Sequence, residues 1–458
     1  MRRHDLIILG AGTGNALVDE RFAHLDVALV SDGPFGGTCL NAGCIPSKML
    51  AATADTADTV RDAARFDVDA QLRGVDWPAV RSRVFDRLDR AAREGEEGRR
   101  EDEHITVYRG TARFTGPRRL TVRTEDGAEE ITADRVVIAA GGRPVVPDVL
   151  QKARLPFETS DTIMRIDEVP DRLVVLGGGY IAAELAHVFH SLGSRITVVE
   201  KADRLLGRQQ DEQVSQAFTD AVRGRWDLRL GRELTAVRGA PGALLLTLDD
   251  GAQLEADTLL VAVGRRPNGD LLDLDAAGVE TDDSGRITVD ERMRTTAEGV
   301  WALGDISTPV PLKHVANREA EIVAHNLLHP DEQRSMRYDA VPSAVFTHPQ
   351  IAQVGLTEQE ARDQGLDYAV AVHDYADVAY GWALEETRGF CKVLADRRTG
   401  RLLGGHLLGP QAATLVQPLV IALTTGMTAR ELAEVPLWIH PALTEVVENA
   451  LRDLDTRR

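Results

Sequence analysis

Cysteine is scarce in this sequence, with three residues in a chain of 458. A low and odd count excludes a secreted scaffold held by several disulfides, and it suits a reducing cytoplasm, where a disulfide that forms is usually catalytic. Cys391 lies in a strand-like stretch, and we interpret it as a small buried hydrophobe. Cys39 and Cys44 are separated by only four residues, so this pair is the candidate for a redox-active disulfide.

Long hydrophobic runs are also lacking. No stretch of about 18 or more apolar residues occurs, so we expect no membrane span. The N-terminus leads into a strand and a glycine turn at Asp5–Gly10 rather than into a signal peptide. Positive charge is in deficit, with a formal net charge of −19, and an acidic chain repels nucleic acids and anionic membranes. We therefore expect a cytoplasmic protein with neither of these as a partner.

Glycine, in contrast, is plentiful and clustered after apolar runs. Leu6–Val30 and Leu173–Val199 share the order strand, glycine turn, Ala-rich helix, strand, which is the βαβ unit of dinucleotide-binding folds. Strand-to-glycine turns at Val136–Pro144 and Leu259–Asn268 mark domain edges. After about residue 336 the pattern is α+β without a glycine fingerprint. The sequence predicts an α/β protein with two Rossmann-like dinucleotide-binding domains and a C-terminal α+β domain.

The first fingerprint is Gly10-Ala11-Gly12-Thr13-Gly14-Asn15. Gly10 allows a tight turn, and Gly12 lets the backbone approach a pyrophosphate at the start of the following helix. Asn15 replaces the usual third glycine, and Gly14 beside it provides the clearance instead. The acidic residue expected at the end of the second strand is replaced by Ser31. Either Asp32 binds the ribose or this contact is lost.

The second fingerprint is Gly177-Gly178-Gly179-Tyr180-Ile181-Ala182, in which Ala182 is a permitted variant of the third glycine. The next strand ends in Glu200, which is placed to accept both ribose hydroxyls and therefore favours NADH. The neighbouring Lys201, Arg204 and Arg208 favour the 2′-phosphate of NADPH instead. The sequence leaves both nucleotides open.

The stretch Gly36–Lys48 contains both close cysteines. Two cysteines at this separation close a small ring, which predicts a strained and reducible disulfide. Pro46 and the Ala-rich run that follows place Cys44 near a helix N-terminus, where the dipole stabilises a thiolate. The alternatives are two structural cysteines or part of a metal site. A metal site lacks a second cysteine cluster to complete it, so we expect no metal.

A histidine near the C-terminal end of the chain, His440, is followed five residues later by Glu445. Reduction of a disulfide requires a group that gives a proton to the leaving thiol, and imidazole titrates in the right range. Glu445 is placed to orient the ring. Taken alone, such a histidine is more often a capping or surface residue. With the cysteine pair and the nucleotide fingerprints it becomes a catalytic candidate.

Together these motifs resemble the pyridine-nucleotide disulfide oxidoreductases. The two fingerprints, G-G-T-C-x4-C-x-P-x-K, A-x-G-x-x-P twice, G-D-I and the terminal H-P-x3-E occur in the order of that family. The resemblance covers nearly the whole chain. It implies an FAD-binding domain at 1–145 and 268–335, an NAD(P)-binding domain at 146–267, and a dimerisation domain at 336–458. It also implies a homodimer in which His440 acts on the cysteines of the other subunit.

The resemblance further implies a role for each matching residue. The nucleotide reduces the flavin, the flavin opens the Cys39–Cys44 bond, Cys44 lies nearer the flavin, and Cys39 attacks a small-molecule disulfide. Lys48 and Glu184 match the pair beside the flavin nitrogen, and Asp305 matches the residue on the ribityl chain. We expect FAD and NADPH as cofactors, with NADH as the alternative. The other positions that match cofactor-binding residues are Gly10, Gly12, Gly14, Asn15, Asp32, Thr38, Ala140, Gly141, Gly177, Gly179, Tyr180, Ile181, Glu200, Lys201, Gly264, Leu312 and His314.

Three functions remain open from the sequence. The stretches Asp374–Ala383, Leu312–Asn317 and Trp438–Asn449 resemble those of family members that reduce the disulfide of a sugar-linked thiol, and the resemblance implies this substrate. Glu200 favours NAD-dependent oxidation of dihydrolipoamide. A flavin-bearing structural or regulatory protein without turnover is the third, and it conflicts with the intact cysteine and histidine sets.

Overall fold

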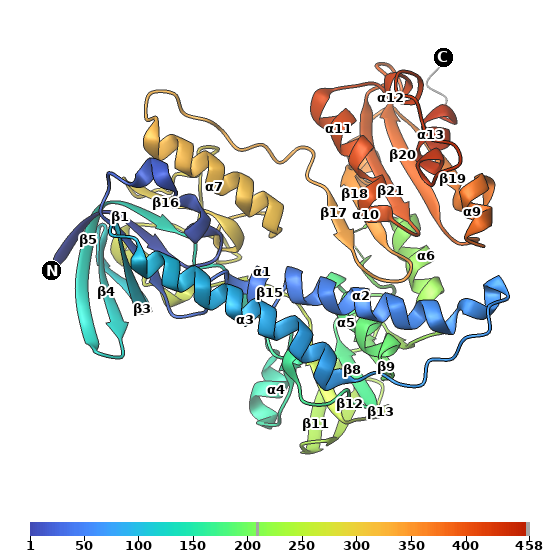
Figure 1. The fold of residues 1–458 in the computed structure, drawn as a ribbon, viewed down its shortest axis with the longest axis horizontal. Helices are drawn as coiled ribbons and strands as arrows, with labels where there is room; N and C mark the ends of the chain where they lie inside the picture. The colour runs from blue at the N-terminus through green and yellow to red at the C-terminus, as the bar shows by residue number, and fades with distance from the viewer. Residues whose placement is uncertain (208–209, 455–458) are drawn as a thin grey trace.

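The computed structural model describes residues 1–207 and 210–454. Figure 1 shows three α/β bodies, and the C-terminal one, in orange and red, stands apart from the blue-to-yellow body that holds the N-terminus. The predicted fold class is confirmed, because two of the bodies contain parallel sheets with glycine turns and the third contains neither. The boundaries at 145, 267 and 335 remain predictions. Each helix in the described ranges is too short or too polar to cross a lipid bilayer.

The first body is built on a sheet in which β1 lies between two parallel partners. Leu6 pairs with Val27 of β2, and Ile7 pairs with Val136 of β5. The carboxyl ends of these strands meet at one edge, which is where ligands bind in α/β sheets. The strands of this sheet are β1 (Arg2–Leu9), β2 (Val27–Ser31), β3 (Ile105–Gly116), β4 (Arg119–Thr124), β5 (Gly127–Ile138) and β16 (Val300–Ala302).

The connection from β1 to β2 differs from the predicted Ala-rich helix. Two short 3₁₀ helices, η1 (Thr13–Leu17) and η2 (Glu20–Phe22), take its place. Val18 is extended between them, and the Asp19 carboxylate accepts a hydrogen bond from the N–H of Arg21 at 3.0 Å. An aspartate that bonds to nearby backbone in this way ends one helical turn and starts another. The prediction of one continuous helix after the first fingerprint was therefore wrong.

Helices cover the first sheet and the edge where its strands end. The charged stretch after residue 76 forms one of them, because the Asp76 carboxylate caps it by accepting from the N–H of Ala79 at 3.0 Å. Its apolar face, which includes Val84 and Leu88, is buried. The helices of this body are α1 (Gly37–Asn41), α2 (Cys44–Arg61), η3 (Ala63–Phe66), α3 (Trp77–Glu101), η8 (Gly304–Ile306) and α7 (Lys313–Leu328).

The second body has a parallel sheet in the order β10-β9-β8-β14-β7 and a three-stranded antiparallel sheet. Here the fingerprint leads from β8 into a continuous helix, α5, as predicted. The elements are α4 (Asp148–Ala153), β7 (Glu158–Thr159), η4 (Ile163–Arg165), β8 (Arg172–Leu176), α5 (Tyr180–Ser191), β9 (Arg195–Glu200), α6 (Glu212–Val222), β10 (Asp227–Leu230), β11 (Leu234–Ala240), β12 (Ala243–Leu248), β13 (Gln253–Ala256) and β14 (Thr258–Val261).

The chain enters and leaves the second body at one place. β6 (Gly142–Pro144) pairs antiparallel with β15 (Arg265–Pro267), so the two connections form a two-stranded stalk. These strands lie in the two strand-to-glycine turns of the sequence. After β15, η6 (Gly269–Leu271) and η7 (Leu274–Ala277) lead back to the first sheet, where β16 pairs with β5.

The third body is a five-stranded antiparallel sheet with helices. Cys391 lies on β20 and is fully buried, and burial raises the pKa of its thiol, which supports its interpretation as a structural residue. The strands, in sheet order, are β17 (Ser343–Val345), β18 (Ile351–Gly355), β21 (Leu402–Leu408), β20 (Phe390–Asp396) and β19 (Tyr368–Asp374). The helices are α8 (Glu358–Asp363), η9 (Tyr375–Asp377), α9 (Ala379–Ala383), α10 (Ala412–Leu415), α11 (Gln417–Thr425), α12 (Ala429–Glu434) and α13 (Thr444–Arg452).

Candidate active site

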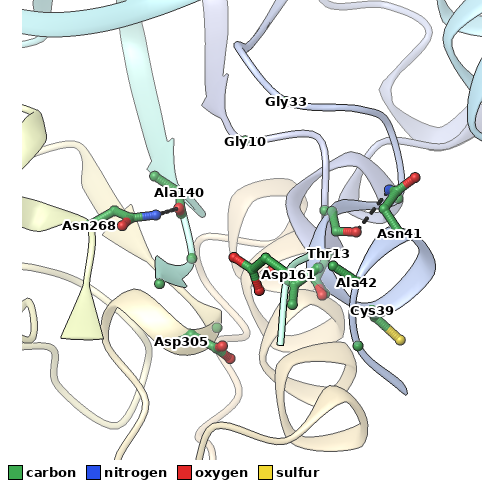
Figure 2. Close-up of a pocket in the computed structure, with 18 of the residues that line it drawn as sticks. Gly10, Thr13, Gly33, Cys39, Asn41, Ala42, Ala140, Asp161, Asn268 and Asp305 are labelled. Carbon is green, nitrogen blue, oxygen red and sulfur yellow. Dashed lines mark hydrogen bonds between the residues drawn. The ribbon is translucent and has the colours of Figure 1, made fainter. Parts of the chain in front are cut away.

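A cavity of about 850 Å³ lies at the carboxyl ends of β1 and β5 and extends to the start of α5. Figure 2 shows Gly10, Cys39 and Asp305 among the residues around it. The structure therefore brings many of the predicted residues together, although they come from distant parts of the sequence. The predicted residues that line the cavity are Gly10, Gly12, Asp32, Thr38, Cys39, Cys44, Lys48, Ala140, Gly141, Tyr180, Ile181, Glu184, Asp305 and Leu312.

The residues of this cavity fit FAD. Gly10 has a φ of +113°, and a Cβ there would lie 2.3 Å from the carbonyl oxygen of Ala139, so the turn requires glycine. The Lys313 ammonium donates a hydrogen bond to the Thr13 hydroxyl at 2.8 Å, which places a positive charge beside this turn. Burial raises the pKa of Asp305. A half-buried carboxyl that lines a cavity is suited to bind a ligand hydroxyl.

The two cysteines occupy adjacent helices, with Cys39 on α1 and Cys44 as the first residue of α2, and both thiols are free. A hydrogen bond from the Cys39 thiol and the nearby Lys48 ammonium lower the pKa of Cys44 to about 7. The same hydrogen bond and burial raise the pKa of Cys39. Cys44 is therefore the thiolate of the reduced pair near neutral pH, while Cys39 keeps its proton.

This difference predicts a pH dependence for alkylation of the reduced protein. We expect the rate at which iodoacetamide modifies Cys44 to rise with pH and to reach half its maximum near pH 7, because the thiolate is the reacting form. Mass spectrometry of the modified peptides, at a series of pH values, measures this rate. A midpoint near the ordinary thiol value of about 8.5 would contradict the assignment. Cys391 serves as an internal control, because its burial should keep it unmodified.

Lys48 lies one helical turn after Cys44 and forms an ion pair across two bodies. Its ammonium is 2.6 Å from Oε2 of Glu184, which lies on α5. Glu184 is buried, whereas the Lys48 side chain is 35% exposed, so solvent screens the pair in part. The ammonium therefore holds its position at the base of the cavity, next to the thiolate it stabilises.

The second fingerprint places Glu200 against its glycine turn. A Cβ on Gly178 would lie 2.8 Å from Cγ of Glu200, so this side chain packs directly on the turn. The Glu200 carboxylate accepts a hydrogen bond from the N–H of Ala202 at 2.8 Å, which fixes its orientation. Gly177 has a φ of +109°, as the tight turn requires, and Gly179 immediately precedes α5. This arrangement has the glycine turn and the acidic residue expected of a dinucleotide site, and neither lines the large cavity.

The basic residues proposed for a 2′-phosphate are engaged with carboxylates. Lys201 is 3.1 Å from Glu233, and Arg204 is 2.9 Å from Glu212. Arg208 lies outside the described residues. Glu200 is therefore the charged side chain that the structure places most directly on the second glycine turn.

His440 is not among the residues that line the cavity. Its Nδ1 is 2.7 Å from Oε1 of Glu445, as the predicted pairing requires, but its side chain is 72% exposed. The residues before it are apolar and also exposed, and Leu437 is 100% exposed. Clustered exposed apolar residues mark surfaces that another protein covers. Within one chain, the structure brings His440 to Glu445 but not to the cysteines.

Several other predicted positions do not line the cavity. Asn15 accepts a hydrogen bond from the Arg99 guanidinium at 2.8 Å, which ties it to α3. His314 is bonded to the carbonyl oxygen of Pro342 at 2.9 Å, on the segment that leads to β17. Gly14 and Gly264 are likewise absent from the lining. Asn15 and His314 therefore have structural surroundings that the matching motif did not indicate. Gly14 provides the predicted clearance, because a Cβ there would lie 2.7 Å from Cβ of Ala139.

The cavity also contains residues that the sequence did not single out as site residues. The Arg265 guanidinium is 3.0 Å from the Asp161 carboxylate, and Nδ2 of Asn268 donates to the carbonyl oxygen of Ala140 at 2.8 Å. Figure 2 shows this last bond. Arg265 and Asn268 belong to the second strand-to-glycine turn, so the repetition of that motif was the signal that could have identified them. Asp161 lies outside every motif that we recognised.

Comparisons with known proteins agree with this geometry. The family described as "Pyridine nucleotide-disulphide oxidoreductase" matches residues 4–320, and its dimerisation domain matches residues 341–451. The chain is 50% identical to the mycothione reductase of Mycobacterium tuberculosis, over 99% of this chain and 100% of that protein. It is 32% identical to the dihydrolipoyl dehydrogenase of Chlamydia muridarum, over 99% and 97% of the two chains.

Solved structures show the same relationship. A Cu(II) complex of the HOCl-induced flavoprotein disulfide reductase RclA from Escherichia coli has a TM-score of 0.87 and 28% identity, with 99% of each chain covered. LpdA from Mycobacterium tuberculosis has a TM-score of 0.86 and 25% identity, again with 99% of each chain covered. The resemblance found in the sequence is thereby confirmed, and the chain belongs to the pyridine nucleotide-disulphide oxidoreductase family.

Proposed function

We propose that this chain reduces mycothione, a disulfide of a sugar-linked thiol, with a reduced pyridine nucleotide, through FAD and the Cys39–Cys44 pair. The observation that carries the proposal is the 50% identity to a mycothione reductase across the full length of both proteins. The site supports it, because the pKa of Cys44 is lowered to about 7, which makes a large fraction of it thiolate at neutral pH, and Cys44 lies in the cavity that fits FAD. The proposed location is the cytoplasm.

The residues around the cavity divide the reaction between them. Bound FAD would accept two electrons from the pyridine nucleotide and supply them to the Cys39–Cys44 disulfide, which opens to two thiols. The sulfur of Cys39 then attacks one sulfur of mycothione, and the first thiol leaves. The Cys44 thiolate attacks the Cys39 sulfur, releases the second thiol and re-forms the Cys39–Cys44 bond. One nucleotide and one proton are consumed for each disulfide converted to two thiols.

The high pKa of Cys39 gives His440 its proposed task. Because Cys39 keeps its proton near neutral pH, a base must remove this proton before the sulfur can attack. His440, oriented by Glu445 at 2.7 Å, is proposed to take the proton and pass it to the first leaving thiol. Since His440 does not line the cavity of its own chain, we propose that it acts on the other subunit of a homodimer. The exposed Leu437 and Ile439 beside it suit a subunit interface.

The position of Glu200 favours NADH over NADPH. The carboxylate packs on the glycine turn, where it would accept the ribose hydroxyls and repel a 2′-phosphate, and Lys201 is paired with Glu233. We expect Glu200→Ala to raise the ratio of kcat/KM for NADPH to that for NADH by about tenfold, because it removes this repulsion. Steady-state kinetics with each nucleotide measure the ratio. Asp203→Ala is a matched control on an exposed carboxylate of the same loop, and an equal effect of both variants would show that only net charge matters.

Dihydrolipoamide dehydrogenase is the second candidate, and Glu200 is the observation that favours it. The purified protein should be assayed with mycothione and with lipoamide, each with NADH and with NADPH. Turnover of mycothione supports the proposal. Turnover of lipoamide without turnover of mycothione would replace it with the second candidate.

A further inference from the structure

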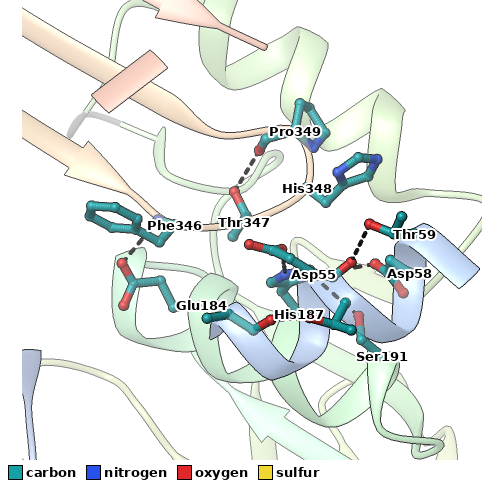
Figure 3. Close-up of polar contacts among 12 residues, drawn as sticks. Asp55, Asp58, Thr59, Glu184, His187, Ser191, Phe346, Thr347, His348 and Pro349 are labelled. Carbon is teal, nitrogen blue, oxygen red and sulfur yellow. Dashed lines mark hydrogen bonds and ion pairs between the residues drawn. The ribbon is translucent and has the colours of Figure 1, made fainter. Parts of the chain in front are cut away.

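The Lys48–Glu184 pair has a third member, which comes from the third body. Phe346 directly follows β17, and its backbone N–H donates to Oε1 of Glu184 at 3.0 Å, while Oε2 binds the Lys48 ammonium. Figure 3 shows the Glu184–Phe346 bond. The centroid of the Phe346 ring also lies 4.8 Å from the Lys48 nitrogen, within the range of a cation–π contact. One residue therefore contacts both charges of the pair.

The loop that carries Phe346 is fixed at both ends. The buried hydroxyl of Thr347 donates to the carbonyl oxygen of Pro349 at 2.7 Å, as Figure 3 shows. Arg225 donates to the carbonyl oxygen of His348 at 3.3 Å and pairs with Asp58 of α2 at 2.6 Å. The loop is thus bonded to α5 through Glu184 and linked to α2 through Arg225. The position of Phe346 is set by a rigid network.

A lysine needs such support to hold a defined position. Its ammonium is a point charge on a flexible four-carbon stem, and it does not form the planar, two-point contacts of arginine. The carboxylate of Glu184 fixes the distance of the Lys48 ammonium from α5. The ring of Phe346 limits where else this ammonium can move. The fixed ammonium then faces Cys44, whose pKa it lowers. If this restraint is lost, the Lys48 ammonium should lower the pKa of Cys44 less.

We propose that Phe346 is a positioning residue, which fixes the Lys48 ammonium toward Cys44 and toward the cavity that fits FAD. The third body thereby has a part in the electrostatics of the redox site in addition to dimerisation. The expected effect on the flavin midpoint potential rests on the proposed function. The expected effect on the pKa of Cys44 does not, because it involves only side chains of this chain.

The test compares Phe346→Leu with Phe346→Tyr in the full-length, FAD-loaded protein. The first replaces the ring with an aliphatic side chain, and the second keeps the ring. We expect Phe346→Leu to raise the pH midpoint of Cys44 alkylation by about half a pH unit and to make the flavin midpoint potential more negative. Phe346→Tyr should keep the wild-type values. The other charged or titratable groups around the pair are unchanged in both variants; they are Cys39, Asp305, Tyr180 and Glu184.

A double-mutant cycle with Lys48→Met separates positioning from simple packing. Lys48→Met should itself raise the Cys44 midpoint, and Phe346→Leu should then cause no further shift. A full shift in the Lys48→Met background, or no shift from Phe346→Leu alone, would overturn the proposal. Phe346→Met provides the same test if the leucine variant fails to fold. The alkylation measurement needs no disulfide substrate, so a failure of mycothione turnover would refute the proposed function and leave this result intact.

Discussion

Replacing Cys39 with serine should lower the rate of mycothione reduction by about 10³-fold or more, because a serine hydroxyl cannot form the mixed disulfide. The variant should still bind FAD, since Cys39 contributes only part of the lining of a cavity with many other contacts. Steady-state consumption of the nucleotide with mycothione measures the loss. Reduction of an artificial quinone acceptor, which does not need the cysteines, reports whether the flavin is still reduced.

Cys391→Ala is the matched control for this experiment. Cys391 is the third cysteine of the chain and is buried on β20, away from the cavity. We expect the variant to keep the wild-type rate, because its thiol takes no part in the chemistry. Full activity of Cys39→Ser would show that the cysteine pair is idle. In that case the proposed mechanism through this pair would be wrong.

Replacing His440 with alanine should lower kcat for mycothione by roughly 10²–10⁴-fold, the usual contribution of a general acid–base residue. The physical reason is the high pKa of Cys39, which leaves the attacking sulfur protonated unless a base removes its proton. Glu445→Gln should cause a smaller loss, because it keeps a hydrogen-bond acceptor for Nδ1 but removes the charge that stabilises the imidazolium. Steady-state kinetics of both variants measure these effects.

Mixed dimers test whether His440 acts between subunits. If it does, a dimer of one Cys39→Ser subunit and one His440→Ala subunit contains one complete site, formed by the intact cysteines of one chain and the intact histidine of the other. Refolding or co-expression of the two inactive variants should then restore a substantial part of the activity. An inactive mixed dimer, isolated with two different affinity tags, would show that His440 acts within its own chain.

The parts of the fold that sequence could predict are those set by local chemistry. The turns at Gly10 and Gly177 require a positive φ after an apolar strand, and both were recognised from the glycines alone. The helix expected after Gly10 was not found, because Asp19 bonds to the N–H of Arg21 and restarts the helical turn. Such competition between a side chain and the backbone leaves only a weak signal in the sequence.

The site was predicted where its motifs are contiguous and missed where partners are distant. Cys39, Cys44 and Lys48 lie within one stretch and share one cavity. Asp161 meets Arg265 across 104 positions of sequence, and the N–H of Phe346 reaches Glu184 across 162. No local pattern reports contacts of this range, since they depend on how distant parts of the chain fold together. Asn15 shows the converse, because its motif pointed to a ligand while Arg99 binds it.

The stalk formed by β6 and β15 bears on how proteins of this architecture can exchange a domain during evolution. Because the chain enters and leaves the second body through two paired strands, that body is an insertion with adjacent ends, the arrangement that best tolerates domain exchange. A single contiguous stretch of gene could be replaced without rerouting the first sheet. The graft would have to keep Glu184 and Arg225, which bond to Lys48 and Asp58 outside it. Under the proposed function, the choice of reductant could thus be exchanged without altering the cysteine pair.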